Sequence, residues 1–471
     1  MIGAHTVQQV RAAEAALMTT LPAGSLMQRA ATGLAVRCAR LLGGPYGARV
    51  MLLVGAGDNG GDALFAGAKL ARRGARVDAI LARPDRAHTA GLAALTAAGG
   101  TVADNPGRLA DVDLVIDGLL GIGGSGGLRK DAAELAALAA ERPGLVVAVD
   151  LPSGIDPDTG ELPGEHVVAD VTVTFGTRKI ALVVDPAAAA AGRVEDVDIG
   201  LAPYLPEPSV ELFEAADVGA LLPIPARDTD KYARGVVGVV AGSAEYSGAA
   251  VLSTGGAVRG GAGMVRYVGP DEVVRAVQSR WPESVAGMGR VQAWVVGPGL
   301  GEDPRGGRML DKAMSDGVPI VVDADGLRFL PHRLDVPALL TPHAGELARL
   351  LGTTREDVEA RRLQHARDAA ARWNAVVLLK GSTTLVAAPD GQVRANPTGT
   401  PVLATAGSGD VLAGLAGALM GAGLDPLDAG SLAAYVHGVA GQLAAKSTPY
   451  PSATTILDVL PHALRRLAGD T

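Results

Sequence analysis

Cysteine is nearly absent from this sequence. Cys38 is the single thiol, so no internal disulfide can form, which is typical of a reducing compartment. Basic blocks are absent too, and the net charge of −8 disfavours nucleic acid as a partner. We therefore expect a cytoplasmic protein that does not bind nucleic acid.

Long apolar runs are also missing. None reaches the roughly 20 residues that cross a membrane, and the first residues lack a basic segment followed by an apolar core, so we expect no membrane association. Aromatic residues make up only 3% of the chain, so its cores must be built from Ala, Val and Leu. No segment has the form Gly-x-x-x-x-Gly-Lys-Ser/Thr, which excludes a P-loop nucleotide site.

Glycine, in contrast, is abundant, with 64 residues that show no collagen-like period. They fall in turn positions between short apolar runs and helical patterns, which is typical of an α/β protein. At 471 residues the chain is too long for one core. A proline-rich segment over residues 201–225 indicates a domain boundary. We predict two doubly wound domains, 1–210 and 211–471.

In the first half, four apolar runs suit buried parallel strands. Two helices are expected within residues 6–42, broken near Pro22, and a third over 63–73. Strand, glycine loop and helix in this order predict a Rossmann-like sheet. The strands are predicted at 49–54, 112–116, 145–149 and 171–175.

Polar residues follow three of these strands. Asn59 lies in the glycine loop after the first strand, Asp117 ends the second, and Asp150 and Ser153 follow the third. Because the carboxyl ends of parallel strands meet at one edge of a sheet, we expect these side chains in one region. Such an oxygen-rich site suits a phosphate-bearing ligand plus a hard cation. The alternative is that each aspartate is only a helix cap or a turn former.

Strand–loop–helix units recur along the second half, and this pattern predicts a second doubly wound domain. His343 follows one strand, just before a helix, and either touches a ligand or serves as a structural hydrogen-bonding group. Lys380 precedes Gly-Ser-Thr-Thr and is either a polyphosphate clamp or a solvated lysine ahead of a polar turn. The strands are predicted at 235–241, 264–268, 293–296, 319–322, 339–340 and 376–379.

The stretch 396–414 is a loop of small residues that passes directly into an apolar helix, predicted over 411–420. Small residues let backbone N–H groups approach an anion, and the start of a helix adds its dipole. Asp410 stands at that start. It is either a base beside a bound phosphate or merely the acidic residue of a well-capped helix.

These motifs resemble known families. The pair Asn396-Pro397-Thr398-Gly399 and Gly407-Ser408-Gly409-Asp410 resembles the ribokinase-like kinases. The second half as a whole looks like the ADP/ATP-dependent NAD(P)H-hydrate dehydratases, through that pair and Gly297-Pro298-Gly299-Leu300-Gly301, Thr341-Pro342-His343 and Lys380-Gly381-Ser382. The first half resembles the NAD(P)H-hydrate epimerases, through Asp58-Asn59-Gly60-Gly61-Asp62, Asp117, Asp150-Leu151-Pro152-Ser153 and Lys179. Both halves in this order resemble fused, bifunctional nicotinamide nucleotide repair enzymes.

For the first half, the resemblance implies that two loops and Asp150 hold the hydrated nucleotide, with Asp150 as the candidate acid/base. It also implies a K⁺ site. The nucleotide contacts would be Asp58, Asn59, Gly60, Gly61, Asp62, Gly121, Ile122, Gly123, Gly124, Ser125, Gly126, Gly127 and Asp150, and the K⁺ ligands Asn59, Asp117 and Ser153. Two departures stand out: Asp58 replaces the family's usual asparagine and adds negative charge, and Ile122 replaces a threonine, which removes a hydroxyl contact.

For the second half, the resemblance implies that Gly299, His343 and Asp410 contact the hydrate, with Asp410 as the catalytic base. ADP or ATP would be held, with Mg²⁺ on its phosphates, by Lys380, Gly381, Ser382, Thr383, Thr384 and Gly409. The implied substrates are NADHX and NADPHX, which carry a hydroxyl at C6 of the reduced nicotinamide ring in R and S forms. The first half would interconvert the two forms and the second would dehydrate the S form. A homo-oligomer is also implied.

Two other functions fit the same residues. The second half could be a small-molecule kinase that keeps the phosphoester, and the first half could be a catalytically silent binding or oligomerising module. A plain dehydrogenase is disfavoured, because Asp58, Asn59 and Asp62 fill the loop where a pyrophosphate would lie.

Overall fold

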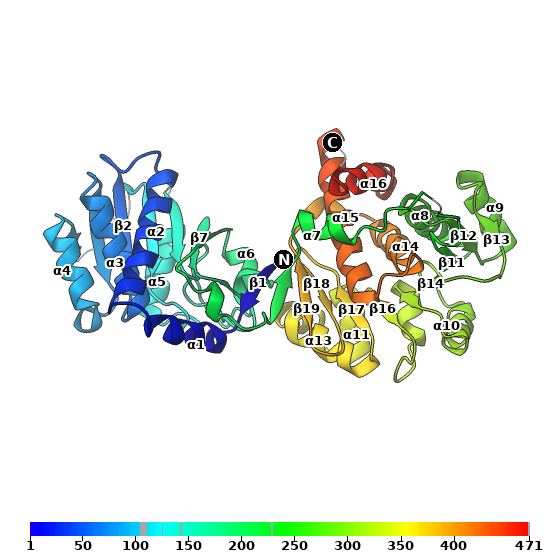
Figure 1. The fold of residues 1–471 in the computed structure, drawn as a ribbon, viewed down its shortest axis with the longest axis horizontal. Helices are drawn as coiled ribbons and strands as arrows, with labels where there is room; N and C mark the ends of the chain where they lie inside the picture. Colours follow the sequence, from blue (N-terminus) through cyan, green and yellow to red (C-terminus); the bar gives the residue numbers. More distant parts are fainter. Residues whose placement is uncertain (104–110, 125, 142–143, 228, 470–471) are drawn as a thin grey trace. The chain divides into compact units, whose positions relative to one another are not determined.

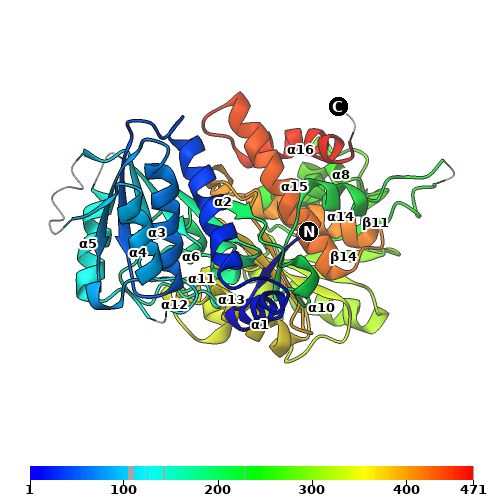
Figure 2. The ribbon, with the colours of Figure 1, turned by 60° about the vertical axis from the view of Figure 1, so that its left-hand side comes forward.

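The computed structural model describes residues 1–103, 111–124, 126–141, 144–227 and 229–469 (Figures 1 and 2). The chain folds as two compact units. Gly3–Val210 form the N-terminal unit, and Glu211–Thr471 with Met1–Ile2 form the C-terminal unit.

The N-terminal unit is built on a parallel sheet in the order β4-β3-β2-β5-β6-β7-β9. Its central strands are apolar runs buried on both faces, as expected when helices cover a parallel sheet. The chain changes direction across the sheet between β2 and β5, which is the place where such sheets bind ligands at their carboxyl edge. The strands are β2 (Arg49–Val54), β3 (Arg76–Leu81), β4 (Thr101–Val102), β5 (Leu114–Gly118), β6 (Leu145–Val149), β7 (Val171–Phe175) and β9 (Arg193–Val197), and β1 (Ile2–His5) pairs with β8 (Arg178–Lys179).

Helices cover both faces of this sheet. Val50, Leu52 and Val54 of β2 pack with α2, α3 and α4, whereas the alternate residues Met51 and Leu53 pack with α5. Figures 1 and 2 both show α2, α3 and α4 side by side. The helices are α1 (Val7–Met18), α2 (Ser25–Leu41), α3 (Asp58–Ala71), α4 (Thr89–Ala97), α5 (Lys130–Ala140) and α6 (Ala187–Ala190).

The C-terminal unit has a second, mostly parallel sheet in the order β13-β12-β11-β14-β15-β16-β17-β18-β19-β10. Only β18 runs antiparallel to its neighbours among these strands of the described chain. The strands are β10 (Val210–Leu212), β11 (Val236–Val240), β12 (Met264–Tyr267), β13 (Val285–Ala286), β14 (Ala293–Val296), β15 (Ile320–Val322), β16 (Ala338–Leu340), β17 (Val376–Leu379), β18 (Thr384–Ala387) and β19 (Val393–Asn396).

Helices cover both faces here as well. Val376 and Leu378 of β17 belong to the core that contains α14 and α15, so the alternate residues Val377 and Leu379 face the other side, where α13 contacts the strand. The helices are α7 (Ala215–Leu221), α8 (Ser247–Arg259), α9 (Asp271–Arg280), α10 (Arg305–Asp316), α11 (Ala344–Leu351), α12 (Arg355–Ala360), α13 (Arg362–Trp373), α14 (Ser408–Gly421), α15 (Pro426–Ser447) and α16 (Ala453–Leu467). No helix in the described part of the chain is both long and apolar enough to cross a membrane.

The predicted fold class is confirmed, because both units are α/β with helices on both faces of a parallel-rich sheet. Five predicted strands have the bounds that the structure shows. They are 49–54, 145–149, 171–175, 293–296 and 376–379.

Three predicted elements begin two or more residues away from where the structure shows them, and four other predicted strands differ by one residue at one or both ends. Helix α3 begins at Asp58 rather than at residue 63, α14 begins at Ser408 rather than at 411, and β5 runs two residues later than expected, so that Asp117 lies inside it. The glycines were read as loop residues, but several lie within the helices because packing requires them. A Cβ on Gly60 would lie 2.4 Å from the carbonyl oxygen of Gly55. The polar residues of 58–62 therefore stand on the first turns of a helix.

Candidate functional site

The three predicted K⁺ ligands of the N-terminal unit meet around the backbone of Leu120. The Ser153 hydroxyl donates to Asp117 Oδ1 at 2.7 Å and accepts from the Leu120 N–H at 2.8 Å. Asn59 Nδ2 donates to the Leu120 carbonyl at 3.0 Å, and Ser153 Oγ lies 3.1 Å from the same oxygen. Strand β5, the start of α3 and the turn after β6 thus bring Asn59, Asp117 and Ser153 together, although they are far apart in sequence.

Asp117 is fully buried in this cluster. Burial raises the pKa of Asp117 to about 6, and hydrogen bonds from Ser153 and from the Leu119 N–H oppose that rise. The groups that converge here are a carboxylate, an amide, a hydroxyl and a carbonyl, so they offer oxygen donors of the kind that hard cations prefer. The residues present therefore fit the hard cation expected from the sequence, which the family resemblance implies to be K⁺.

Asp150 takes a different partner. Its Oδ1 forms an ion pair with Lys179, whose side chain is 1% exposed, and accepts from the Thr174 hydroxyl at 3.1 Å and the Phe175 N–H at 3.2 Å. The backbone of Asp150 has a φ of 65°, which is uncommon for a residue with a side chain and is more often found at functional sites. Within the described residues Oδ2 has no partner, so this oxygen is available to a ligand.

Two further carboxyl groups belong to this region. Asp62, on α3, is 9% exposed, and its Oδ1 has no hydrogen-bond partner among the described residues. Burial raises its pKa well above the ordinary value, and the charges of Asp150, Asp58 and Glu14 add to the rise while Lys179 opposes it. Burial also raises the pKa of Glu14 on α1. Sequence reasoning missed Glu14, because one acidic residue on an amphipathic helix gives no signal.

The glycine loop 121–127 passes close to these groups. A Cβ on Gly121 would lie 3.0 Å from Asn59 Oδ1, so a side chain there would press on the amide. Ile122 packs against the apolar core, which explains how an isoleucine is accommodated at this position. A Cβ on Gly123 would lie 3.4 Å from the guanidinium of Arg11, again on α1. The predicted contact Ser125 lies outside the described residues.

In the C-terminal unit, Asp410 lies in the first turn of α14, after Gly407, which has a φ of 87°. Burial raises the pKa of Asp410 to about 7. The nearby carboxylates Asp323, Asp325 and Glu346 add to the rise, and the ammonium of Lys380 opposes it. A carboxyl group with a pKa near neutrality is well suited to accept a proton from a substrate hydroxyl.

Lys380 approaches this helix start from the end of β17. Its Nζ lies 2.9 Å from Asp323 Oδ1 and 3.8 Å from Glu346 Oε2, and only 3.4 Å from the place that a Cβ on Gly409 would occupy. Asp323 is 1% exposed and follows β15. It was not among the predicted site residues, although an aspartate directly after a parallel strand is the same signal that singled out Asp150.

His343 caps α11. Its Nδ1 accepts from the N–H groups of Gly345 at 3.0 Å and Glu346 at 3.2 Å, which makes it a structural hydrogen-bonding group. Burial lowers the pKa of His343, and Glu346 opposes that change. The side chain is nevertheless 54% exposed, with Nε2 at 3.4 Å from Glu346 Oε1. Because Nδ1 is occupied, Nε2 is the atom that remains for a ligand.

The predicted hydrate contact Gly299 lies where the loop after β14 meets the start of α8. It has a φ of 62°, and a Cβ there would lie 2.6 Å from the Cβ of Ala249 and 2.9 Å from that of Tyr246. This close approach requires glycine. A cavity of about 290 Å³ shares Asp325 and Glu346 with the surroundings of Asp410. It is lined by Ala324, Asp325, Leu327, Arg328, Glu346, Arg349 and Leu350.

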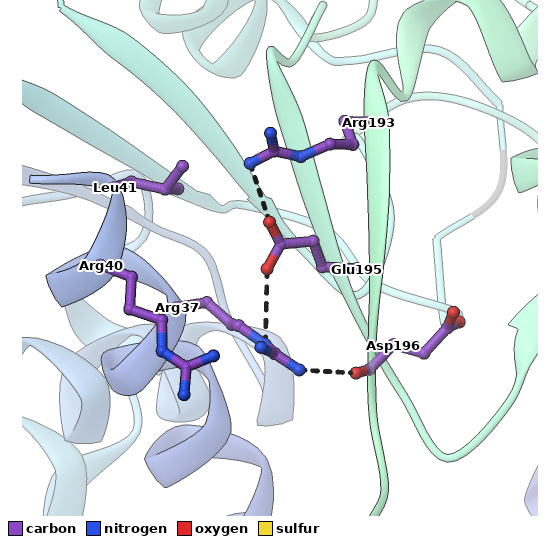
Figure 3. Close-up of a pocket in the computed structure, with 6 residues that line it drawn as sticks. All are labelled: Arg37, Arg40, Leu41, Arg193, Glu195 and Asp196. Atoms are coloured by element: carbon purple, nitrogen blue, oxygen red, sulfur yellow. Dashed lines mark hydrogen bonds and ion pairs between the residues drawn. The ribbon is translucent and has the colours of Figure 1, made fainter.

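Another cavity, of about 390 Å³, lies between α2 and β9 of the N-terminal unit and includes none of the predicted site residues (Figure 3). Glu195 bridges Arg193 at 2.8 Å and Arg37 at 3.4 Å, and Arg37 also donates to the carbonyl of Asp196 at 3.3 Å. Most charges that face this cavity are therefore satisfied within the protein.

Known proteins resemble the whole chain. The bifunctional NAD(P)H-hydrate repair enzyme Nnr of Mycobacterium tuberculosis is 49% identical over 435 residues, which cover 89% of each chain. The corresponding enzyme of Mycobacterium leprae is 48% identical over 456 residues, 94% of each chain. The chain belongs to the bifunctional NAD(P)H-hydrate repair enzymes.

Family models and solved structures agree with this membership. The model described as NAD(P)H-hydrate dehydratase matches residues 237–462, and the model described as YjeF-related protein N-terminus matches residues 23–181. The ADP/ATP-dependent NAD(P)H-hydrate dehydratase of Bacillus subtilis, co-crystallized with ATP/Mg²⁺, is 28% identical with a TM-score of 0.51 and covers 55% of this chain and 99% of its own. A ribokinase-like superfamily protein of Enterococcus faecalis, 23% identical with a TM-score of 0.51, covers 56% of this chain and 98% of its own and shares the fold. The chain is thus a repair enzyme whose C-terminal unit shares the fold of these two proteins.

Proposed function

We propose that residues 1–210 epimerise the R and S hydrates of NADH and NADPH, and that residues 211–471 dehydrate the S form at the expense of ADP or ATP, giving AMP or ADP and phosphate. The observation that carries this proposal is Asp410. It is a largely buried carboxyl with a pKa of about 7, at the start of a helix and beside Lys380, in a chain about half identical to named repair enzymes.

Dehydration requires phosphorylation of the C6 hydroxyl, because hydroxide is a poor leaving group and phosphate is a good one. Asp410 takes the proton of the C6 hydroxyl while the hydroxyl oxygen forms a bond to the terminal phosphoryl group and the bond from that group to the nucleotide breaks. The C6–O bond then breaks, phosphate leaves with the electron pair, and the lone pair of the ring nitrogen assists. Loss of a proton from the adjacent carbon completes the reduced ring.

The chain's own groups stabilise the charge that moves. The N–H group of Gly409, at the start of α14, faces the transferred phosphoryl group, and the loop 380–384 holds the rest of the nucleotide. Nε2 of His343 and the close turn at Gly299 orient the hydrate. The described residues contain no cluster of three metal-binding side chains. Mg²⁺ is commonly bound by one or two carboxylates plus phosphate oxygens. Asp323 and the nucleotide phosphates would hold it here, and it would neutralise phosphate charge.

In the N-terminal unit, Asp150 is the candidate acid/base. Its Oδ1 is held by Lys179 and its Oδ2 has no partner in the described part of the chain, so the free oxygen can exchange a proton with the C6 hydroxyl or with water. K⁺ would be held by Asn59, Asp117 and Ser153 and would supply a positive charge for the substrate phosphates. Asp62 lies in the same region; it is buried, and its Oδ1 has no hydrogen-bond partner among the described residues.

The test is incubation of the purified protein with hydrated NADH and with ADP or ATP in turn. We expect the near-ultraviolet absorbance of the reduced ring to return, with one free phosphate for each molecule recovered. A stable phosphorylated product instead of phosphate would support a small-molecule kinase. No recovery with either nucleotide would exclude the proposed dehydration.

A further inference from the structure

Arg362 is buried directly beneath the loop 380–384. Its side chain is 2% exposed, although arginine is almost never fully buried without partners. Nη2 donates to three carbonyl oxygens of the loop, those of Leu379 at 3.2 Å, Lys380 at 3.0 Å and Thr383 at 3.4 Å. Arg362 is the first residue of α13, and the loop 380–384 comes later in the chain, directly after β17. The hydrogen bonds of Arg362 thus hold both ends of this loop.

The loop is shaped around this guanidinium. A Cβ on Gly381 would lie 2.2 Å from Nη2 and 2.7 Å from Cζ of Arg362, so a side chain there would displace the guanidinium. Nη1 of Arg362 pairs with Glu359 at 2.5 Å, which fixes the guanidinium from the other side. The Thr384 hydroxyl donates to the Gly381 carbonyl at 3.3 Å and closes the turn.

Arg362 also decides which backbone groups the loop offers to a ligand. It draws the loop carbonyls inward, and in the described residues the N–H groups of Gly381 and Ser382 have no protein acceptor. Successive backbone N–H groups left open in a turn form an anion-binding concavity. The positive charge of Arg362 lies behind them, and Lys380 Nζ, paired with Asp323, lies at their start.

We propose that Arg362 is a positioning residue for the adenine nucleotide: it sets the shape of the loop 380–384 so that its N–H groups bind phosphate oxygens. The inference rests on the proposed function, in which this loop holds ADP or ATP. Arg362 does not touch the hydrate or the reacting atoms. Its loss should therefore weaken nucleotide binding and leave hydrate binding unchanged.

The experiment compares Arg362→Met and Arg362→Lys with the full-length wild type. ADP binding is measured directly by calorimetry, and the KM values for ADP and for the hydrate are measured separately. We expect Arg362→Met to weaken ADP binding by on the order of tenfold or more. The reason is that a displacement of the loop by about 1 Å moves its N–H groups out of hydrogen-bonding distance of the phosphate oxygens. The KM for the hydrate should stay within about twofold. Arg362→Lys keeps the charge but cannot reach three carbonyls, so its effect should be intermediate.

Arg394→Met is the matched control. Arg394 is 8% exposed and pairs with Glu211 and Asp428, neither of which belongs to the loop, so its loss reports what removal of a buried arginine does to stability. Wild-type ADP affinity in folded Arg362 variants, or equal losses of affinity in the Arg394 and Arg362 variants, would overturn the inference and leave the proposed function standing. A wild type that binds neither ADP nor ATP would overturn both.

Discussion

Asp410 has two properties that suit a base which deprotonates a hydroxyl during phosphoryl transfer. It lies at a helix start, and its pKa is about 7. Asp410→Asn keeps the shape and removes the base. We expect dehydration to fall by about a hundredfold or more, which is typical for the loss of a positioned base. Epimerisation in the same preparation should be unchanged. Near-normal dehydration by this variant would remove Asp410 from the chemistry.

The raised pKa of Asp410 also predicts a pH dependence. The base acts only when it is ionised, so the dehydration rate should rise as the pH increases through about 7 and level off above it. Values of kcat/KM for the hydrate, which report ionisation of the free enzyme, check this when they are measured on either side of neutrality. A rate that does not change across neutrality would contradict the assignment.

The same pKa makes a prediction about stability. Because folding raises the pKa of Asp410 from its ordinary value of 3.8 to about 7, the folded state binds the proton more tightly than the unfolded chain. The wild type therefore loses stability as the pH rises from about 4 to about 7. Asp410→Asn removes that loss, so its Tm relative to the wild type should increase over this range. A difference in Tm that is the same at every pH would show that ionisation of Asp410 does not affect stability.

Ser153 tests the K⁺ site. Its hydroxyl bridges Asp117 and the Leu120 N–H, so Ser153→Ala leaves buried polar groups unpaired at a cost of about 1–3 kcal/mol. We expect a lower Tm, a weaker rise in Tm when NaCl is replaced by KCl, and slower epimerisation. Ser431→Ala is the control, since Ser431 is 2% exposed and bonds only within α15. It should lower the Tm without changing the response to K⁺.

At the scale of elements, the contact between α14 and α8 holds Asp410 in place. A Cβ on Gly414 of α14 would lie 2.0 Å from the carbonyl oxygen of Ser253 on α8, and a Cβ on Gly256 of α8 would lie 2.3 Å from that of Val411. The two backbones are thus in direct contact, which only glycine permits. The small residues of α14 therefore serve helix packing as well as the anion-binding loop before it.

Gly414→Ala should separate the two helices. We expect a loss of stability of about 1–3 kcal/mol, as for other overpacked cores, and slower dehydration because α14 carries Asp410. Differential scanning calorimetry and the dehydration assay check both effects. Gly248→Ala, on α8, is the control, because a Cβ there meets nothing within 4 Å. If the two variants have the same Tm, the helix contact is not what Gly414 provides.

At the scale of the whole molecule, the two candidate sites lie in separate compact units. If each unit acts alone, variants defective in different units should complement each other. Asp410→Asn should convert R-hydrate to S-hydrate without forming NADH, and Asp150→Asn should dehydrate only the S form. A mixture of the two with ADP should convert pure R-hydrate to NADH. Asp150→Asn alone measures the spontaneous conversion, and a mixture no faster than this background would contradict independent units.

The sequence by itself determined the architecture. Apolar runs such as 49–54 and 376–379, each followed by a glycine loop, predicted parallel strands with correct bounds because their periodicity is local. The same local reasoning misplaced the start of α3 at residue 63. The glycines of 60–61 meet the Gly55 carbonyl and the side chain of His88, which are tertiary contacts that no local pattern contains.

The motifs also selected residues that the structure brings together at the two candidate sites, because Asp117, Ser153, Lys380 and Asp410 stand beside strand ends or a helix start. Which of them pair was decided by the tertiary structure alone. Lys179 holds Asp150, Asp323 holds Lys380, and Glu14 and Arg362 join the sites from distant helices. The physical reason is that burial and charge coupling, which raise the pKa of Asp410, depend on neighbours in space and not on neighbours in sequence.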